Sequence, residues 1–336
     1  MSNAASRWWS RGPDAPALRR AHRSPSVSRR SARRVAAFAA TFVVALTGAV
    51  DASALTVVDD AGHSFVIERP PQRIVTLAPS LTELVFAAGG GASLVGTSAL
   101  SDFPPAARDI ARVGDAGRLD VERVIALKPD LVLIWQRGNT SRELEQLEAA
   151  GLRLFQLEPR RLDDVARAIE RLGQLLGHEA EAKQRASEMR SALDRLRRAH
   201  AGAPPVTVFY QVWRQPLMTV NGKHLIDDIL TLCGGRNVFA GLTPLVPILS
   251  SEAVVGANPE AILTASETAS AQPWRRDPDN PSFAAWHGHR SMTAVRHSWL
   301  YVLNGDNISR QGPRVVDGAA AVCAVLDQVR AERATR

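Results

Sequence analysis

Two tryptophans stand where a binding site can form. Trp135 ends the apolar run "PDLVLIW" (129–135), and Trp213 ends the run "VFYQVW" (208–213). Such runs are typical of β-strands, and in open α/β sheets ligands bind beyond the carboxyl ends of the strands. A tryptophan there offers a flat apolar wall and one N–H donor. We predict that both residues face a planar ligand from equivalent strand ends of two lobes; the alternative is that each indole fills a core.

A polar loop follows a third strand-like run near the C-terminus. The run "WLYVL" (299–303) leads into "NGDNISRQGPR" (304–314), which contains Asp306 and Arg310. If this strand is parallel to its neighbours, both side chains face the same site and could hold amides or a phosphate on the rim of a ligand. A surface salt bridge is the alternative.

The two cysteines, Cys233 and Cys323, allow several kinds of chemistry. A thiol at a helix end beside two glycines could be a nucleophile, a metal ligand or half of a crosslink. The compartment decides, and the N-terminus indicates export. A basic block (29–34) precedes an uncharged apolar run of 16 residues (35–50), shorter than the roughly 20 that a membrane span needs, and "ASA" (52–54) suits a signal peptidase. Residues 1–54 therefore predict a signal peptide, and two cysteines in an exported chain predict one disulfide.

The basic character of the chain belongs to this N-terminal segment. The 336 residues carry a net charge of +7, and residues 1–54 alone hold nine arginines and two aspartates. Subtracting these from the 41 basic and 34 acidic residues leaves 32 of each, so the rest of the chain is neutral. The charge therefore gives no reason to infer a nucleic-acid or membrane-surface partner. We expect an exported monomer that binds no nucleic acid.

Short apolar runs alternate with amphipathic helical stretches, which is the pattern of parallel α/β lobes. The stretch 162–201 is helical by its period and is interrupted once, at Gly177. Its second part is long enough to span a lobe. We therefore predict two Rossmann-like α/β lobes, 55–178 and 204–336, joined by one long helix (179–203), with a ligand cleft between the lobes.

An internal repeat supports two related lobes. "DVERVIALKPDLVL" (120–133) aligns without gaps with "SSEAVVGANPEAIL" (250–263). Each copy reads as a capping residue, an acid in the first turn, a two-turn helix, and a Pro-acid break into an apolar strand. The repeat predicts that Glu122 and Glu252 lie at equivalent places on the two lobe tips. Chance similarity of two short helix–strand units is the alternative.

The motifs of common catalytic sites do not occur. The sequence has no phosphate-binding loop, no Gly-x-Ser-x-Gly elbow and no Cys-x-x-Cys pair. A hydrolase would need a nucleophile beside a base, and the candidate serines have no identifiable histidine partner. These serines are Ser80, Ser250 and Ser251. His287, His289 and His297 could ligate a metal, but histidines in a polar loop are more often solvated, and we predict no catalytic residue and no metal site.

Five segments together resemble the periplasmic cobalamin-binding proteins of ABC importers. They are "RIVTLAPSLTELVFAAG", "LSDFPPAA", "ERVIALKPDLVLIW", "VFYQVWRQPLMTVNGKHLIDDILTLCGGRNVF" and "ISRQGPR", and in this order they cover nearly the whole chain after residue 54. The resemblance implies a carrier that captures cobalamin or a related corrinoid between two lobes and delivers it to the permease of an ABC importer. It implies no enzymatic step and no cofactor besides the transported ligand. The broader class includes haem and siderophore carriers, which are the alternative.

The resemblance also implies roles for single residues. In the family, two glutamates on the lobe tips dock into arginine pockets of the permease, and they fall on Glu122 and Glu252. The ligand-contacting positions fall on Trp135, on the segment around Trp213 and on one loop. This loop consists of Asp306, Asn307, Ile308, Ser309 and Arg310. The pairing of Cys233 with Cys323 is implied as well.

The chain departs from the family where aromatic residues are expected. The tyrosine before the Ser-Asp-aromatic turn is Leu100, which we place in the ligand site. Where the family has tryptophans near the two tip helices, this chain has Ala116 and Val246. Where the family has aromatic residues in the loop after the last strand, this chain has Asn307 and Ile308. The surface available for stacking is therefore reduced. The candidates to replace it are Trp213, Tyr210 and Trp286.

Overall fold

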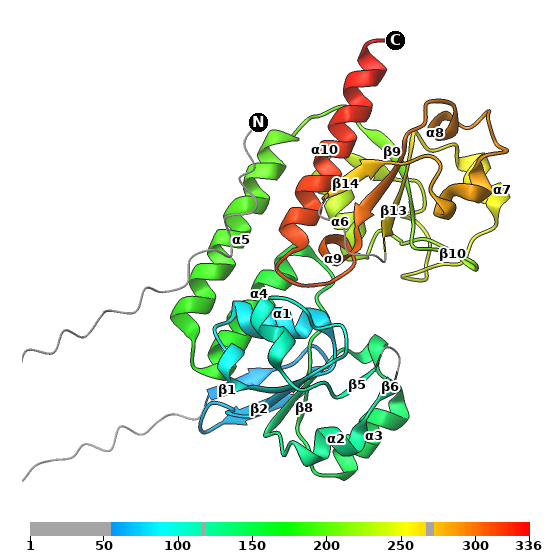
Figure 1. The fold of residues 1–336 in the computed structure, drawn as a ribbon. Helices are drawn as coiled ribbons and strands as arrows, with labels where there is room; N and C mark the ends of the chain where they lie inside the picture. The colour runs from blue at the N-terminus through cyan, green and yellow to red at the C-terminus, as the bar shows by residue number, and fades with distance from the viewer. Residues whose placement is uncertain (1–54, 116–117, 267–271) are drawn as a thin grey trace, which may run out of the picture. The chain divides into compact units, whose positions relative to one another are not determined.

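The computed structural model describes residues 55–115, 118–266 and 272–336. The predicted signal peptide and Ala116 lie outside the described residues. Residues 54–336 form one compact unit. Within it, Figure 1 shows two separate sheets, one in the N-terminal half of the chain and one in the C-terminal half. A separate cluster of buried hydrophobic residues belongs to each half. The predicted class of two α/β lobes is confirmed.

The N-terminal lobe is built on a four-stranded parallel sheet in the order β4-β3-β7-β8. The strands are β3 (Ile74–Thr76), β4 (Leu94–Thr97), β7 (Leu131–Ile134) and β8 (Leu154–Gln156). The helices are α1 (Pro79–Ala87), α2 (Val121–Ala126), α3 (Ser141–Ala149) and α4 (Leu162–Leu176), with short 3₁₀ turns at Gly91–Ser93, Pro105–Asp109 and Gln136–Gly138. Two antiparallel hairpins complete the lobe, β1 (Leu55–Val58) with β2 (Ser64–Ile67) and β5 (Gly114–Asp115) with β6 (Arg118–Leu119). All four residues of β7 are buried, as expected for a strand covered on both faces.

The C-terminal lobe has a five-stranded sheet in the order β12-β9-β13-β15-β14. The strands are β9 (Val206–Gln211), β12 (Gly235–Asn237), β13 (Ala261–Ser266), β14 (Trp274–Arg276) and β15 (Leu300–Asn304), and only β14 is antiparallel. The helices are α6 (Leu225–Leu232), α7 (Ser251–Ala257), α8 (Thr293–Arg296), α9 (Gly305–Ile308) and α10 (Val315–Ala334), with a 3₁₀ helix at Pro281–Trp286. A short hairpin joins β10 (Trp213–Arg214) to β11 (Leu217–Met218). Since β15 runs parallel to β13, the loop after it begins at the carboxyl edge of the sheet, which was the condition for its predicted role.

One long helix runs between the two halves of the chain. α5 (Glu179–Ala199) begins just after Gly177, which ends α4 with a positive φ of 75°. Glycine adopts this left-handed conformation without steric cost because it has no Cβ, so the chain can end α4 and reverse direction into α5. One face of α5 is buried at Ala186, Met189 and Leu193. α5 packs against α4 and also against α10, so it touches both lobes (Figure 1).

The predicted repeat has the same local structure in both copies. The side chain of Asp120 caps α2 by accepting from Arg123 N, and that of Ser250 caps α7 by accepting from Ala253 N. The residue before each proline has a positive φ, 46° at Lys128 and 42° at Asn258. The buried positions also match. They are Val124 and Val254, and Pro129 and Pro259.

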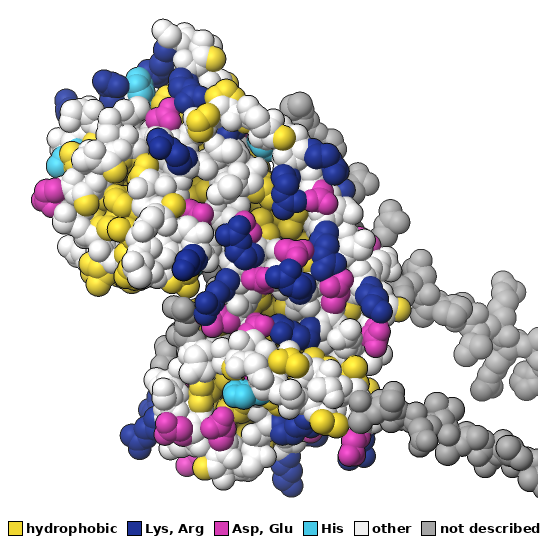
Figure 2. All heavy atoms as spheres, turned by 180° about the vertical axis from the view of Figure 1, so that it is seen from behind, with side chains coloured by type: hydrophobic (Ala, Val, Ile, Leu, Met, Phe, Trp, Pro, Cys, Tyr) yellow, Lys and Arg dark blue, Asp and Glu magenta, His cyan; other side chains and the backbone are white. Residues whose placement is uncertain are grey.

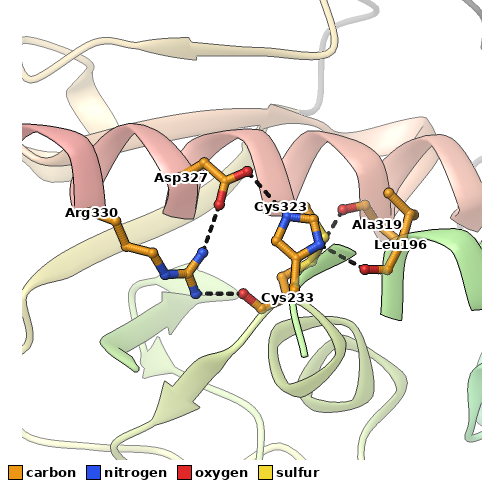
Figure 3. Close-up of a disulfide and its surroundings, with 7 residues drawn as sticks. Leu196, Cys233, Ala319, Cys323, Asp327 and Arg330 are labelled. Atoms are coloured by element: carbon orange, nitrogen blue, oxygen red, sulfur yellow. Dashed lines mark hydrogen bonds and ion pairs between the residues drawn. A yellow bond between two sulfur atoms is a disulfide. The ribbon is translucent and has the colours of Figure 1, made fainter. Parts of the chain in front are cut away.

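The predicted disulfide is present between Cys233, at the end of α6, and Cys323, in α10. Arg330 donates from Nη2 to the carbonyl oxygen of Cys233 at 2.6 Å and from Nη1 to Asp327 Oδ1 at 2.8 Å (Figure 3). His200, just after α5, lies 3.1 Å from the other oxygen of Asp327. The disulfide is thus part of a junction of α5, α6 and α10, and neither cysteine is a free thiol.

The described surface carries charges of both signs. On the face shown in Figure 2, basic and acidic side chains intermingle over the middle of the molecule, and no large region has one sign. Some of these charges are paired between helices, as Arg190 with Glu170 between α5 and α4. Among the described residues, no helix is both long enough and apolar enough to cross a membrane.

Candidate ligand-binding site

A cavity of about 330 Å³ lies at the carboxyl ends of β3, β4 and β7 in the N-terminal lobe. Its lining includes Leu77, Pro79, Leu100, Trp135, Asn139 and Glu143. Trp135 directly follows β7 and is half-buried, and its Nε1 has no hydrogen-bond partner among the described residues. The side chain of Leu100 is 60% exposed. The cavity therefore has an apolar wall to which Trp135 contributes, but the indole N–H is itself buried, so the cavity does not present the predicted N–H donor.

A second cavity, of about 400 Å³, lies at the carboxyl ends of β9 and β13 in the C-terminal lobe. Trp213 lines it and is 48% exposed. β9 ends at Gln211, however, and Trp213 belongs to the β10–β11 hairpin, where it pairs with Met218. The predicted equivalence of the two tryptophans is wrong: β9 lies beside β13 as β3 lies beside β7, so Trp213 follows the counterpart of β3, whereas Trp135 follows β7.

The second cavity is basic. Arg214 and Arg275 line it, and none of the described lining residues is acidic. Arg275 is partly neutralised, because its Nε lies 3.1 Å from Asp277 Oδ2. Neither arginine was predicted from the sequence to line a ligand site. Arg214 adjoins the predicted Trp213, but Arg275 lies on the edge strand β14, which has no counterpart in the repeat.

The predicted loop after β15 is mostly a single helical turn, α9, and its residues do not share one environment. Asp306, Asn307 and Arg310 are half-buried and Ser309 is exposed. Ile308 is only 1% exposed, so it packs inward and its predicted ligand contact is not supported. A turn of helix must bury one side, and here the apolar residue supplies that side.

Two of the three aromatic residues considered for stacking are also buried. Tyr210 is 1% exposed and Trp286 is fully buried. Trp286 donates from Nε1 to Gln211 Oε1 at 2.8 Å, so its polar group is used inside the lobe. Burial raises the pKa of the Tyr210 hydroxyl, against a hydrogen bond with Ser309. Of these three residues, Trp213 alone has a ring surface that a ligand can reach.

Arg310 and Arg314 form a network with acidic residues of both lobes. Arg310 lies 2.7 Å from Asp102 Oδ1, 2.8 Å from Asp306 Oδ1 and 3.2 Å from Glu83 Oε1. Arg314 donates to both oxygens of Glu83, at 2.6 and 3.1 Å. The Glu83 side chain is fully buried. Asp306 and Arg310 thus form the ion pair considered as the alternative, but it is half-buried and belongs to a larger network rather than to the open surface.

The network shifts the ionisation of its acids in two directions. Burial raises the pKa of Glu83, and the guanidinium groups of Arg314 and Arg310 act against that shift. Partial burial opposes ionisation of Asp102, but the hydrogen bond and charge of Arg310 hold its pKa below the usual range. The sequence did contain a signal for Glu83, since it is the one charged residue in α1. A single charge in an apolar helix predicts a buried partner.

The two tip glutamates occupy the first turns of α2 and α7. Glu122 and Glu252 are both exposed. The backbone N–H of Glu252 and the hydroxyl of Ser250 lower the pKa of the Glu252 carboxyl. Neither side chain is buried in its own lobe, so both carboxylates are available to a partner.

The comparisons with known proteins agree with this arrangement of two α/β lobes. A family model described as "Periplasmic binding protein" matches residues 74–306. The chain belongs to the periplasmic binding protein family. It is 34% identical over 288 residues to the vitamin B12-binding protein of Photorhabdus laumondii, a match that covers 84% of this chain and 96% of that protein. It is 33% identical over 258 residues to the vitamin B12-binding protein of Vibrio cholerae, covering 76% and 90%.

Solved structures of the family share its architecture. The crystal structure of the periplasmic vitamin B12 binding protein BtuF of Vibrio cholerae superposes with a TM-score of 0.68 and 31% identity, covering 78% of this chain and 98% of that one. A periplasmic haem binding protein from Pseudomonas aeruginosa superposes with a TM-score of 0.61 and 27% identity, covering 76% and 92%. The family therefore includes solved relatives of two ligand classes.

At least four of the six residues considered for catalysis or metal binding make contacts within the chain. Ser250 caps α7, and the hydroxyl of Ser251 bonds to Glu252. His287 bonds to the carbonyl of Pro278, and the ring of His297 lies against Trp299. Over residues 55–115, 118–266 and 272–336, no group of three His, Cys, Asp or Glu side chains could hold a metal ion.

Proposed function

We propose that this chain captures cobalamin or a related corrinoid in the periplasm and delivers it to the permease of an ABC importer. The observation that carries the proposal is the pair of cavities at the carboxyl edges of the two parallel sheets, each lined by a tryptophan. A corrinoid is large and flat and bears amide groups on its rim. Relatives named for vitamin B12 binding, similar over most of the chain, support this ligand class.

Binding would involve no covalent step. Trp135 and Trp213 provide apolar walls, and Leu100 adds an exposed apolar contact in place of an aromatic one. Asp306, Asn307, Ser309 and Arg310 supply polar contacts for the rim of the ligand. Burial of a large apolar surface gives most of the favourable free energy, and the few polar groups fix the orientation.

Haem is the second candidate, because Arg214 and Arg275 could hold carboxylates and one solved relative binds haem. Haem carriers commonly ligate the iron through a tyrosine or a histidine. Both tyrosines of the chain, Tyr210 and Tyr301, are buried. Of the described residues that line the two cavities, none is a tyrosine or a histidine. A corrinoid needs no such residue, since its cobalt can keep its own axial ligands, and we therefore favour the corrinoid.

Ligand identity is tested by titrating the protein from Leu55 onward with cyanocobalamin, haemin and a ferric hydroxamate siderophore in a calorimeter. We expect sub-micromolar binding of cyanocobalamin only. Trp213→Ala should weaken it at least tenfold, whereas Ile248→Ala, which removes an exposed apolar side chain that lines neither cavity, should leave it unchanged. Tight binding of haemin or the siderophore without cyanocobalamin would refute the corrinoid assignment.

Delivery would require Glu122 and Glu252, the exposed acids at equivalent places in the repeat. Reversal of both charges to lysine should abolish uptake of the ligand by cells while its affinity for the purified protein stays within twofold. A loss of ligand affinity in the double variant would remove these residues from the docking surface. Export through the N-terminal segment is tested by the size and location of the mature chain after expression.

A further inference from the structure

The charged network between the lobes contains a residue with no role in the site described so far. Glu83 lies in α1 of the N-terminal lobe, and its carboxylate is fully buried. Both of its partners, Arg310 and Arg314, lie between α9 and α10 in the C-terminal lobe. The sequence separations are 227 and 231 residues. The contact therefore joins the lobes independently of the long helix α5.

Other groups of the N-terminal lobe hold the same two arginines. Asp102 accepts from Arg310 Nη1 at 2.7 Å. The ring of Phe103 lies under Arg314, with 4.5 Å from the guanidinium carbon to the ring centroid. A carboxylate that binds a guanidinium through two hydrogen bonds, with an aromatic face against the same group, fixes its position and orientation.

The backbone of the C-terminal lobe also closes over the carboxylate. A Cβ at Gly312 would stand 3.0 Å from Glu83 Oε2, so the absence of a side chain at position 312 leaves room for the acid. The C-terminal lobe thus covers the Glu83 carboxylate, and two arginines of that lobe compensate its charge. A buried acid in this setting is strongly dependent on its partners, because losing them would leave an uncompensated charge.

We propose that Glu83 is a positioning residue that ties the two lobes together and presents Arg310 to the ligand in a fixed place. Only the identity of the ligand in this proposal rests on the proposed function. Without Glu83, Arg310 would keep Asp306 on its own turn and the half-buried Asp102, and the lobes would open more widely. A prearranged guanidinium loses less freedom when the ligand binds, so affinity should depend on a residue that the ligand does not touch.

The test compares Glu83→Gln with Glu170→Gln. Glu170 also binds an arginine through both oxygens, but it joins α4 to α5 and lines neither cavity. Spin labels at exposed positions of α3 and α7, introduced as Glu148→Cys and Ala257→Cys, report the distance between the lobes without ligand. We expect Glu83→Gln to broaden the distance distribution and to weaken cyanocobalamin binding at least tenfold, and Glu170→Gln to change neither.

If the distance distribution between the spin labels in Glu83→Gln is as narrow as in the wild type, Glu83 does not hold the two lobes together. An affinity within twofold of the wild type would overturn the positioning of Arg310. If Glu83→Gln does not fold, Gly312→Ala applies the same test by pressing a methyl group on the carboxylate without removing a charge, with the same two outcomes. If the wild type binds no corrinoid, the proposed function fails, but the distances still test the tie.

Discussion

The two copies of the repeat, 120–133 and 250–263, share their framework but not their surroundings. Asp130 accepts hydrogen bonds from the backbone N–H groups of Gln72 and Arg73, and Glu260 accepts one from that of Thr207. Each acid joins the break after its helix to the neighbouring strand, β3 or β9. The same residue classes recur because both copies must satisfy the same backbone groups where a short helix turns into a buried strand.

The cavities above these frameworks differ. The N-terminal cavity has a half-buried tryptophan and both an arginine and a glutamate in its lining, whereas the C-terminal cavity has an exposed tryptophan and two arginines. Only the C-terminal lobe carries a disulfide. The fold constrains the framework but leaves the residues at the carboxyl edges free to vary. Differences there would therefore set the ligand, while the repeat sets the geometry.

The largest expected difference between the lobes follows from reducing the disulfide. The bond closes a loop of 90 residues, and its loss should destabilise the C-terminal lobe by about 4–5 kcal/mol in the chain-entropy model. Hydrogen exchange measured with and without reductant should show faster opening of α6 and α10, with little change in β3 and β7. Equal acceleration in both lobes would mean that they unfold as one unit, and the comparison of two separate cores would fail.

The acids of the repeat provide the next test. Asp130→Ala and Glu260→Ala should each destabilise the protein by about 1–2 kcal/mol, because each removes a charged acceptor from backbone N–H groups. Asp109→Ala is the matched control, since its exposed carboxylate makes no hydrogen bond among the described residues. Urea unfolding measures all three. If one acid of the pair behaves like Asp109, the two breaks are not equivalent in energy.

The framework could be predicted from the sequence, but much of the site could not. Alternating strand and helix patterns, the Pro-acid breaks and Gly177 are local signals, and they gave the lobes, the repeat and the long helix. The site depends on contacts between distant segments, such as Glu83 with Arg314, and no local pattern specifies such a pair. Ile308 was predicted to contact the ligand, but it is buried. A one-turn helix after β15 determines which residue of the loop turns inward, and the sequence pattern did not predict that helix. Trp213 was predicted to end a strand, but it lies in the hairpin that follows β9.

The basic character of the C-terminal cavity predicts where an anionic group of the ligand binds. Cobalamin carries a phosphodiester that cobinamide lacks. Arg214→Gln and Arg275→Gln should each weaken cyanocobalamin binding about tenfold, since a guanidinium binds phosphate well, and should leave dicyanocobinamide binding within twofold. Arg118→Gln, in the N-terminal cavity, is the control and should affect both ligands little. If Arg118→Gln weakens cyanocobalamin binding as much, the phosphodiester is not bound specifically by the C-terminal cavity.

The smallest effect concerns the positive-φ residues before the two prolines. Lysine is disfavoured in the left-handed region and asparagine tolerates it better, so the two copies should respond differently to glycine. Lys128→Gly should stabilise the protein by about 0.5–1 kcal/mol through relief of this strain, reduced by the greater freedom of glycine in the unfolded chain. Asn258→Gly should destabilise it, because the side-chain oxygen of Asn258 accepts a hydrogen bond from Thr293 N at 2.8 Å. Thermal unfolding of the two variants should therefore give shifts of opposite sign. If both variants shift the unfolding temperature in the same direction, the backbone strain is the same in both copies of the repeat. The hydrogen bond between Asn258 and Thr293 would then add nothing to the stability of the C-terminal copy.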